Sequence, residues 1–111
     1  MSYDRIDRTK DNADRAVADI KRDEQNRMAN IKAAGEKVKA DTKNSVDHVK
    51  ANETADVARL KADQNKVGEE RTAEYVKANV NANVDKANSN VKLYKAYAKA
   101  DAEKAKTRAQ P

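Results

Sequence analysis

The chain has 111 residues, with 24 basic and 19 acidic side chains, no cysteine, and no tryptophan or phenylalanine. Leu, Ile and Val are too scarce for a thick globular core. No apolar run approaches the roughly 18 residues that span a bilayer, and Met1–Arg5 lacks the apolar segment of a signal peptide. We therefore expect a soluble protein, inside a cell or within an assembled particle.

From Ile6 to Val67, bulky apolar residues recur at gaps that are near-multiples of the helical turn of about 3.6 residues. Most residues between them are charged, polar or Ala, and the abundant Ala favours helix. This pattern predicts a long amphipathic helix whose narrow apolar stripe packs against other helices. The apolar stripe consists of Ile6, Val17, Ile20, Met28, Ile31, Val38, Val46, Val49, Val57, Leu60 and Val67.

The stripe also has a longer, 29-residue period. Its members between Val17 and Val38 recur at the same spacing as those between Val46 and Val67. This period corresponds to eight turns of about 3.6 residues each, so the stripe can run nearly straight. Either an ordinary amphipathic helix or the duplication of a spacer unit explains it.

The two glycines decide between two all-α architectures. The stripe passes both Gly35 and Gly68 in phase, which predicts a long, nearly continuous helix that self-associates as a coiled coil or helical assembly. As helix-ending residues, the same glycines would instead give an antiparallel three-helix bundle with turns near Gly35 and Gly68.

After Tyr75 the character of the chain changes. Residues 1–74 hold 16 basic and 16 acidic residues, whereas residues 75–111 hold eight basic and three acidic ones. We therefore distinguish a charge-balanced helical region, 1–74, from a basic region rich in Ala and Asn, 75–111, with a frayed end from Thr107. The packing face rotates at Val76 and Val80 and continues through Val84, Val91 and Tyr94.

Within the basic region, Lys92, Lys95 and Lys99 share one helical face close to Tyr97. Lysines can meet phosphates while a tyrosine stacks on bases, so these residues are candidate contacts for nucleic acid or another anionic partner. A solvated basic face explains the same pattern.

The sequence contains no recognisable catalytic motif. His48 is the single histidine, and no phosphate loop, nucleophile motif or pair of metal-binding histidines occurs. A thin helix also offers no cleft that excludes water. We expect no enzyme, no cofactor and no metal, and a surface position for His48.

Residues 34–43, with Ala, Lys and acidic residues in 11-residue spacing, resemble the late embryogenesis abundant proteins of the 11-mer, group 3 type. The resemblance is compositional and covers about residues 29–66. It implies protection during desiccation, with a helix that forms on drying or at membranes. The regular apolar stripe and the many Asn residues depart from that pattern and favour a permanent coiled coil.

The sequence thus predicts a non-catalytic structural protein that acts through helix packing in an oligomer, filament or larger particle. Its partners would be copies of itself or other helical proteins. A stress-protectant helix and an anion-binding C-terminal region are the alternatives.

Overall fold

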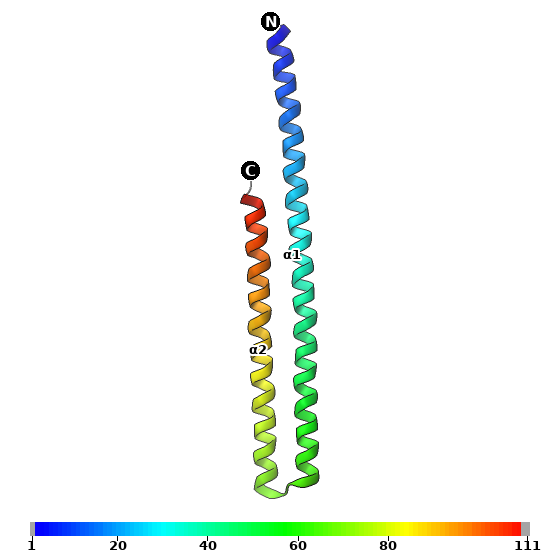
Figure 1. Ribbon diagram of the computed structural model, residues 1–111, viewed down its shortest axis with the longest axis vertical. Helices are drawn as coiled ribbons and strands as arrows, with labels where there is room; N and C mark the ends of the chain where they lie inside the picture. The colour runs from blue at the N-terminus through cyan, green and yellow to red at the C-terminus, as the bar shows by residue number, and fades with distance from the viewer. Residues whose placement is uncertain (1, 110–111) are drawn as a thin grey trace.

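The protein forms a long helical hairpin (Figure 1). The computed structural model describes residues 2–109, with the side chains of residues 4–108. Helix α1 spans Ser2–Asn65 and helix α2 spans Gly68–Ala109. They pack antiparallel in a rod that measures 98 Å by 15 Å by 9 Å between Cα positions. The predicted all-α, elongated architecture is confirmed.

The chain reverses direction at Lys66 and Val67, between the two helices. The Lys66 amide still donates to the Ala62 carbonyl at 2.8 Å, as in a helix. Gly68 then adopts a φ of 60°, the left-handed region that costs other residues about 1–2 kcal/mol. The turn predicted near Gly68 is confirmed, and the helix is therefore not continuous through this point.

Gly35 lies in the middle of α1, so the turn predicted there and the three-helix bundle are wrong. A single glycine costs a helix only about 1 kcal/mol, which the flanking turns can absorb. At the other end, α2 includes Thr107 and Arg108, which were predicted to belong to a frayed tail. The last two positions of that predicted tail, 110 and 111, lie outside the described part of the chain.

The two helices differ in length, because α1 has 64 residues and α2 has 42. The N-terminal part of α1 therefore extends beyond the end of α2 (Figure 1). Every side chain from Asp4 to Gln25 is exposed, and Asn26 is the first that is not. We call residues 4–25 the arm; it is about 33 Å long at about 1.5 Å per residue.

The interior of the hairpin is made of small side chains. Within residues 4–108, the buried positions are alanines and one serine: Ala29, Ala33, Ala51, Ala55, Ala62, Ala78, Ala82, Ser89 and Ala100. We call this set the inner seam. It lets two helices lie close together, but each alanine methyl contributes only about 0.8 kcal/mol on burial.

Candidate interaction surface

The inner seam follows an 11-residue rhythm on both helices. Ala29, Ala40, Ala51 and Ala62 recur at this interval on α1, and Ala78, Ser89 and Ala100 do so on α2; all are buried except the partly buried Ala40. This interval corresponds to three turns of about 3.67 residues, close to a straight helix, so both seams stay in contact without strong supercoiling. The buried Ser89 hydroxyl donates to Asn44 Oδ1 at 2.6 Å.

Six polar contacts fix the register of the two helices along one broad face of the hairpin. In each pair the two residue numbers have the same sum, as an unbroken antiparallel register requires. The pairs are Asn30–Arg108, Lys37–Asp101, Asp41–Tyr97, His48–Asn90, Arg59–Asn79 and Asp63–Tyr75. We call these six contacts the polar ladder. Five of their α1 members also fall into two rows of 11-residue steps, Asn30 with Asp41, and Lys37 with His48 and Arg59.

Ion pairing and hydrogen bonding in the ladder shift the pKa values of three groups. The Tyr97 hydroxyl donates to Asp41, which raises the pKa of Tyr97, and the bond to Asp63 does the same to the pKa of Tyr75. The Lys37 ammonium, 2.8 Å from Asp101 Oδ1, lowers the pKa of that carboxyl. Lys37 also lies over the Tyr97 ring, 5.5 Å from its centre.

The apolar stripe lies on the other side of α1 from the seam. Val38 follows Ala29 by nine positions, or about two and a half turns, and Leu60 follows Ala51 by the same interval. All members of the stripe are exposed in the hairpin, from 45% for Val46 to 82% for Val67. Their predicted packing therefore does not occur within this chain and stays a prediction about partners.

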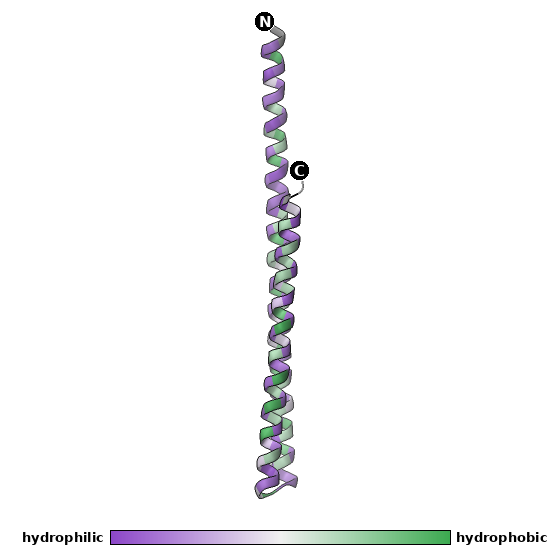
Figure 2. Ribbon diagram, turned by 90° about the vertical axis from the view of Figure 1, so that its left-hand side faces the viewer, coloured by the Kyte–Doolittle hydropathy of each residue, from purple (hydrophilic) through white to green (hydrophobic). Residues whose placement is uncertain are grey.

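Helix α2 carries a second exposed row on its own outer side. It consists of Val76, Val80, Val84, Val91 and Tyr94, between 50% and 65% exposed. Hydrophobic residues accordingly appear along the outer side of α2 in Figure 2. The two rows lie on opposite edges of the rod, so one partner helix cannot cover both.

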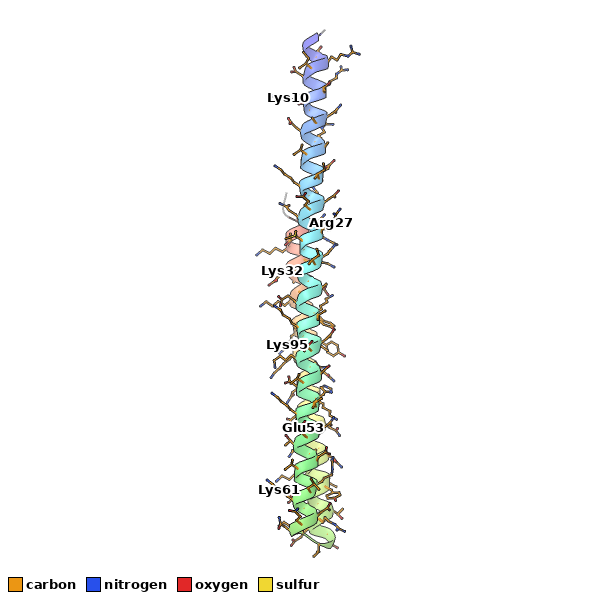
Figure 3. All side chains as sticks on the ribbon, turned by 90° about the vertical axis from the view of Figure 1, so that its right-hand side faces the viewer. Lys10, Arg27, Lys32, Glu53, Lys61 and Lys95 are labelled. Carbon is orange, nitrogen blue, oxygen red and sulfur yellow. The ribbon has the colours of Figure 1, made fainter. Side chains whose placement is uncertain are left out.

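Lysines border one side of the α1 stripe. Because an 11-residue step completes three turns, the lysines fall into two rows beside it. These rows are Lys10, Lys21, Lys32 and Lys43, and Lys39, Lys50 and Lys61. Figure 3 looks onto this outer side of α1: Lys10, Lys32 and Lys61 lie toward one edge and Arg27 toward the other. The stripe itself is interrupted by Glu24 and Glu53.

The arm keeps the stripe but largely loses the seam. The inner positions of the arm lie at 11-residue steps before Asn26 and Ala33, and they carry Arg or Asp. Arg15 and Asp4 precede Asn26, and Arg22 and Asp11 precede Ala33. Only the row of Ala29 keeps a small residue, at Ala18, before it reaches Asp7. Charged side chains do not pack closely against a second helix as Ala does. The inner face of α1 thus turns polar where α2 ends, while the outer face stays apolar through Val17 and Ile20.

The structure separates the predicted C-terminal contacts from one another. Tyr97 belongs to the polar ladder and is partly buried, so its ring and hydroxyl already have partners. Lys92 lines an open hollow with Lys43, Lys50, Asp47 and Asp85. Carboxylates at this site offset the lysines, which weakens attraction for an anion.

Lys99 lines a second hollow together with Lys32, Glu36 and Glu103, where two carboxylates again accompany the lysines. Lys95 is exposed and points toward the same edge as Lys32 in Figure 3. The three predicted lysines therefore remain on the surface. Two of them lie next to acidic residues that α1 contributes and that are distant from them in the sequence.

His48 is partly buried in the ladder, where its Nε2 and Asn90 Oδ1 lie 2.9 Å apart, so it is not the free surface residue that its sequence context predicted. Among residues 4–108, no three His, Asp or Glu side chains gather as metal ligands would. Neither described helix contains a stretch long and apolar enough to cross a membrane. No family model, curated protein sequence or solved structure matches this chain.

The inner seam and the ladder were not predicted from the sequence. Apart from Tyr75 and Tyr97, both consist of residues that carry no signal in a pattern of bulky apolar side chains: Ala, Ser, Asn, His and single charged groups. A signal was nevertheless present, because alanines recur at 11-residue intervals from Ala29 to Ala62.

Proposed function

We propose that this protein is a non-catalytic assembly protein, whose hairpin associates with further copies of itself through the apolar stripe of α1. One observation carries this proposal: among residues 4–108 every buried apolar side chain is an alanine, whereas all the Val and Ile side chains, Met28 and Leu60 are exposed. In a chain that acts alone, the larger apolar groups would be expected inside.

The area of the stripe supports a specific contact. Its nine members from Val17 to Leu60 are each about half exposed or more, which offers on the order of 800 Å² per copy, the size of one side of a standard interface. Full burial from water is worth about 1.5–3 kcal/mol per such side chain, and each is already about half covered, so each gains about half of that, at least as much as an alanine of the inner seam. Association through the stripe would therefore add apolar stabilisation comparable to what the hairpin obtains internally.

Sedimentation velocity over a range of concentrations tests the proposal. We expect an elongated oligomer at micromolar concentration, which dissociates on dilution with a loss of helicity. The double variant Val49→Lys/Leu60→Lys should weaken association at least about 100-fold, because two lysines on the stripe would be buried without partners. Asn12→Lys/Ser45→Lys adds the same charge at exposed positions off both the stripe and the polar ladder and should associate like the unaltered chain.

A monomer that stays fully helical at sub-micromolar concentration would overturn the proposal, as would equal association of the two double variants. Circular dichroism in buffer also separates assembly from a stress-protectant role. A helical spectrum without lipid or drying supports assembly, whereas a coil that becomes helical only on vesicles or on drying supports the alternative.

A further inference from the structure

The spacing of the bulky residues in the apolar stripe is the same in both directions along α1. Between Val17 and Leu60 it has nine bulky members, and reversal about a point between residues 38 and 39 exchanges eight of them in pairs. The ninth, Val38, lies beside the centre of reversal. The exchanged pairs are Val17 with Leu60, Ile20 with Val57, Met28 with Val49, and Ile31 with Val46.

The row on α2 has no comparable symmetry. No centre of reversal exchanges more than one pair among Val76, Val80, Val84, Val91 and Tyr94. The reversal symmetry therefore belongs to the stripe of α1 rather than to apolar residues at helical spacing in general.

A contact between two identical chains about a twofold axis places residue i of one copy opposite residue j of the other, and j opposite i. Resting on the assembly function proposed above, we infer that two hairpins pair antiparallel through their α1 stripes, with the twofold axis passing between Val38 and Lys39. Each exchanged residue then meets a bulky residue of the second copy.

The twofold axis brings the lysine-bordered side of one α1 beside the same side of the second, and the glutamates within the stripe offset part of that positive charge. Reversal about the same centre places Glu24 of one copy opposite Glu53 of the second. Each glutamate has a lysine three positions before it, Lys21 or Lys50, at the border of the stripe. The four side chains meet as two carboxylates and two ammonium groups without net charge, and this cluster occurs twice.

The pairing also gives the arm a helix to pack against. Residues 12–25 of one copy lie beside residues 52–65 of the second, where α2 supports that helix from behind. Val17 and Ile20, which α2 of their own chain does not reach, then pack on Leu60 and Val57 of the second copy. In a parallel, in-register pair the two arms would meet only each other, beyond the ends of both α2 helices.

Each α2 stays clear of the contact, because the stripe and the inner seam lie on opposite sides of α1. The pair is therefore a flat row of four helices with the two α1 in the middle. The apolar rows on both α2 remain on its outer edges.

Cysteine cross-linking tests this geometry cleanly, because the natural sequence contains no cysteine. The full chain is prepared with Val17→Cys, with Leu60→Cys or with Val38→Cys, and each is treated with a short bis-maleimide. We expect little covalent dimer from the first two variants alone and at least tenfold more from their equimolar mixture. Val38→Cys alone should cross-link efficiently, because two copies of residue 38 meet near the axis.

A mixture of Met28→Cys with Leu60→Cys is the matched control, because these positions lie about three helical turns out of register and should not cross-link. Circular dichroism of every variant establishes that each remains helical. If sedimentation finds a dimer but Val17→Cys links to itself, the pairing is parallel and this inference is overturned while the assembly function stands. If sedimentation finds only monomer, the assembly function is overturned as well.

Discussion

The inner and outer sides of α1 carry side chains of different size, and only the inner side packs against α2. The inner side has alanines at 11-residue intervals and leaves room for a second helix close by, whereas the outer side carries Val, Ile, Leu and Met. The inner contact gains little apolar burial per residue, and the polar ladder sets its register. The difference shows that the tightest contact in a helical hairpin does not have to be its most hydrophobic one.

The arm and the paired part of α1 differ in the same way. In the paired part the inner positions are mostly small, and in the arm they are mostly Asp and Arg. The apolar stripe crosses this boundary without change. Two independent patterns therefore run along one helix, and only one of them depends on α2.

Enlarging a seam alanine should have the largest effect on the hairpin. We predict that Ala55→Leu, which places a large side chain among Ala78 and Ala82, destabilises the fold by about 1–3 kcal/mol, because the helices must move apart. Thermal unfolding followed by circular dichroism measures this change. Ala34→Leu, at an exposed position of the same helix, should change the melting temperature little. Equal effects at both sites would mean that the seam is not closely packed.

The turn between the helices should be the next most sensitive place. Gly68→Ala forces a Cβ into the left-handed region, although no neighbouring atom lies within 4 Å of that Cβ. We therefore predict a loss of about 1–2 kcal/mol from backbone strain alone. Chemical denaturation of Gly68→Ala and Gly68→Asn provides the measurement, and Asn, which tolerates this conformation better, should be the milder change. Identical losses would argue against strain as the cause.

Substitution of the other glycine, Gly35, should stabilise the protein rather than destabilise it. Gly35 is helical, and a Cβ at this position meets nothing within 4 Å. Gly35→Ala should raise the free energy of unfolding by about 0.5–1 kcal/mol, because alanine loses less backbone entropy in a helix. Denaturation at a concentration where the chain is monomeric gives the value. A destabilised variant under that condition would contradict the uninterrupted helix found at this point.

The smallest effect concerns the polar ladder at alkaline pH. The bond to Asp41 raises the pKa of Tyr97 above its ordinary value of 10.0, so its contribution to stability is complete below that ordinary value and is lost as the pH rises through the shifted one. Tyr97→Phe should thus remove part of the stability that the unaltered chain loses as the pH rises above the ordinary tyrosine pKa of 10.0. Tyr94→Phe, on the exposed row of α2, removes only the smallest of the influences that raise the pKa of Tyr97 and should leave most of that loss in place. Denaturation at neutral and alkaline pH compares the three proteins.

Much of the fold follows from local properties that the sequence states directly. Abundant Ala, Lys, Glu and Arg with only two glycines favour helix, and the spacing of the stripe identifies one face of α1. Gly68 was recognisable as a place where a helix could end, but Gly35 was equally so. Both glycines keep the stripe in phase, and backbone conformation at either one depends on whether the following segment finds a surface on which to pack.

The sequence by itself therefore determined that the chain is helical and which residues form the apolar stripe, because both arise from residues close together in the chain. Only the tertiary structure decided that Ala29 through Ala62 form the inner face, that His48 meets Asn90, and that Tyr97 belongs to the ladder. The contacts of His48 and Tyr97 join positions 42 and 56 apart in the chain. Each depends on where the chain turns, and alanine, although the weakest apolar signal in the sequence, is the side chain that lets two helix backbones approach.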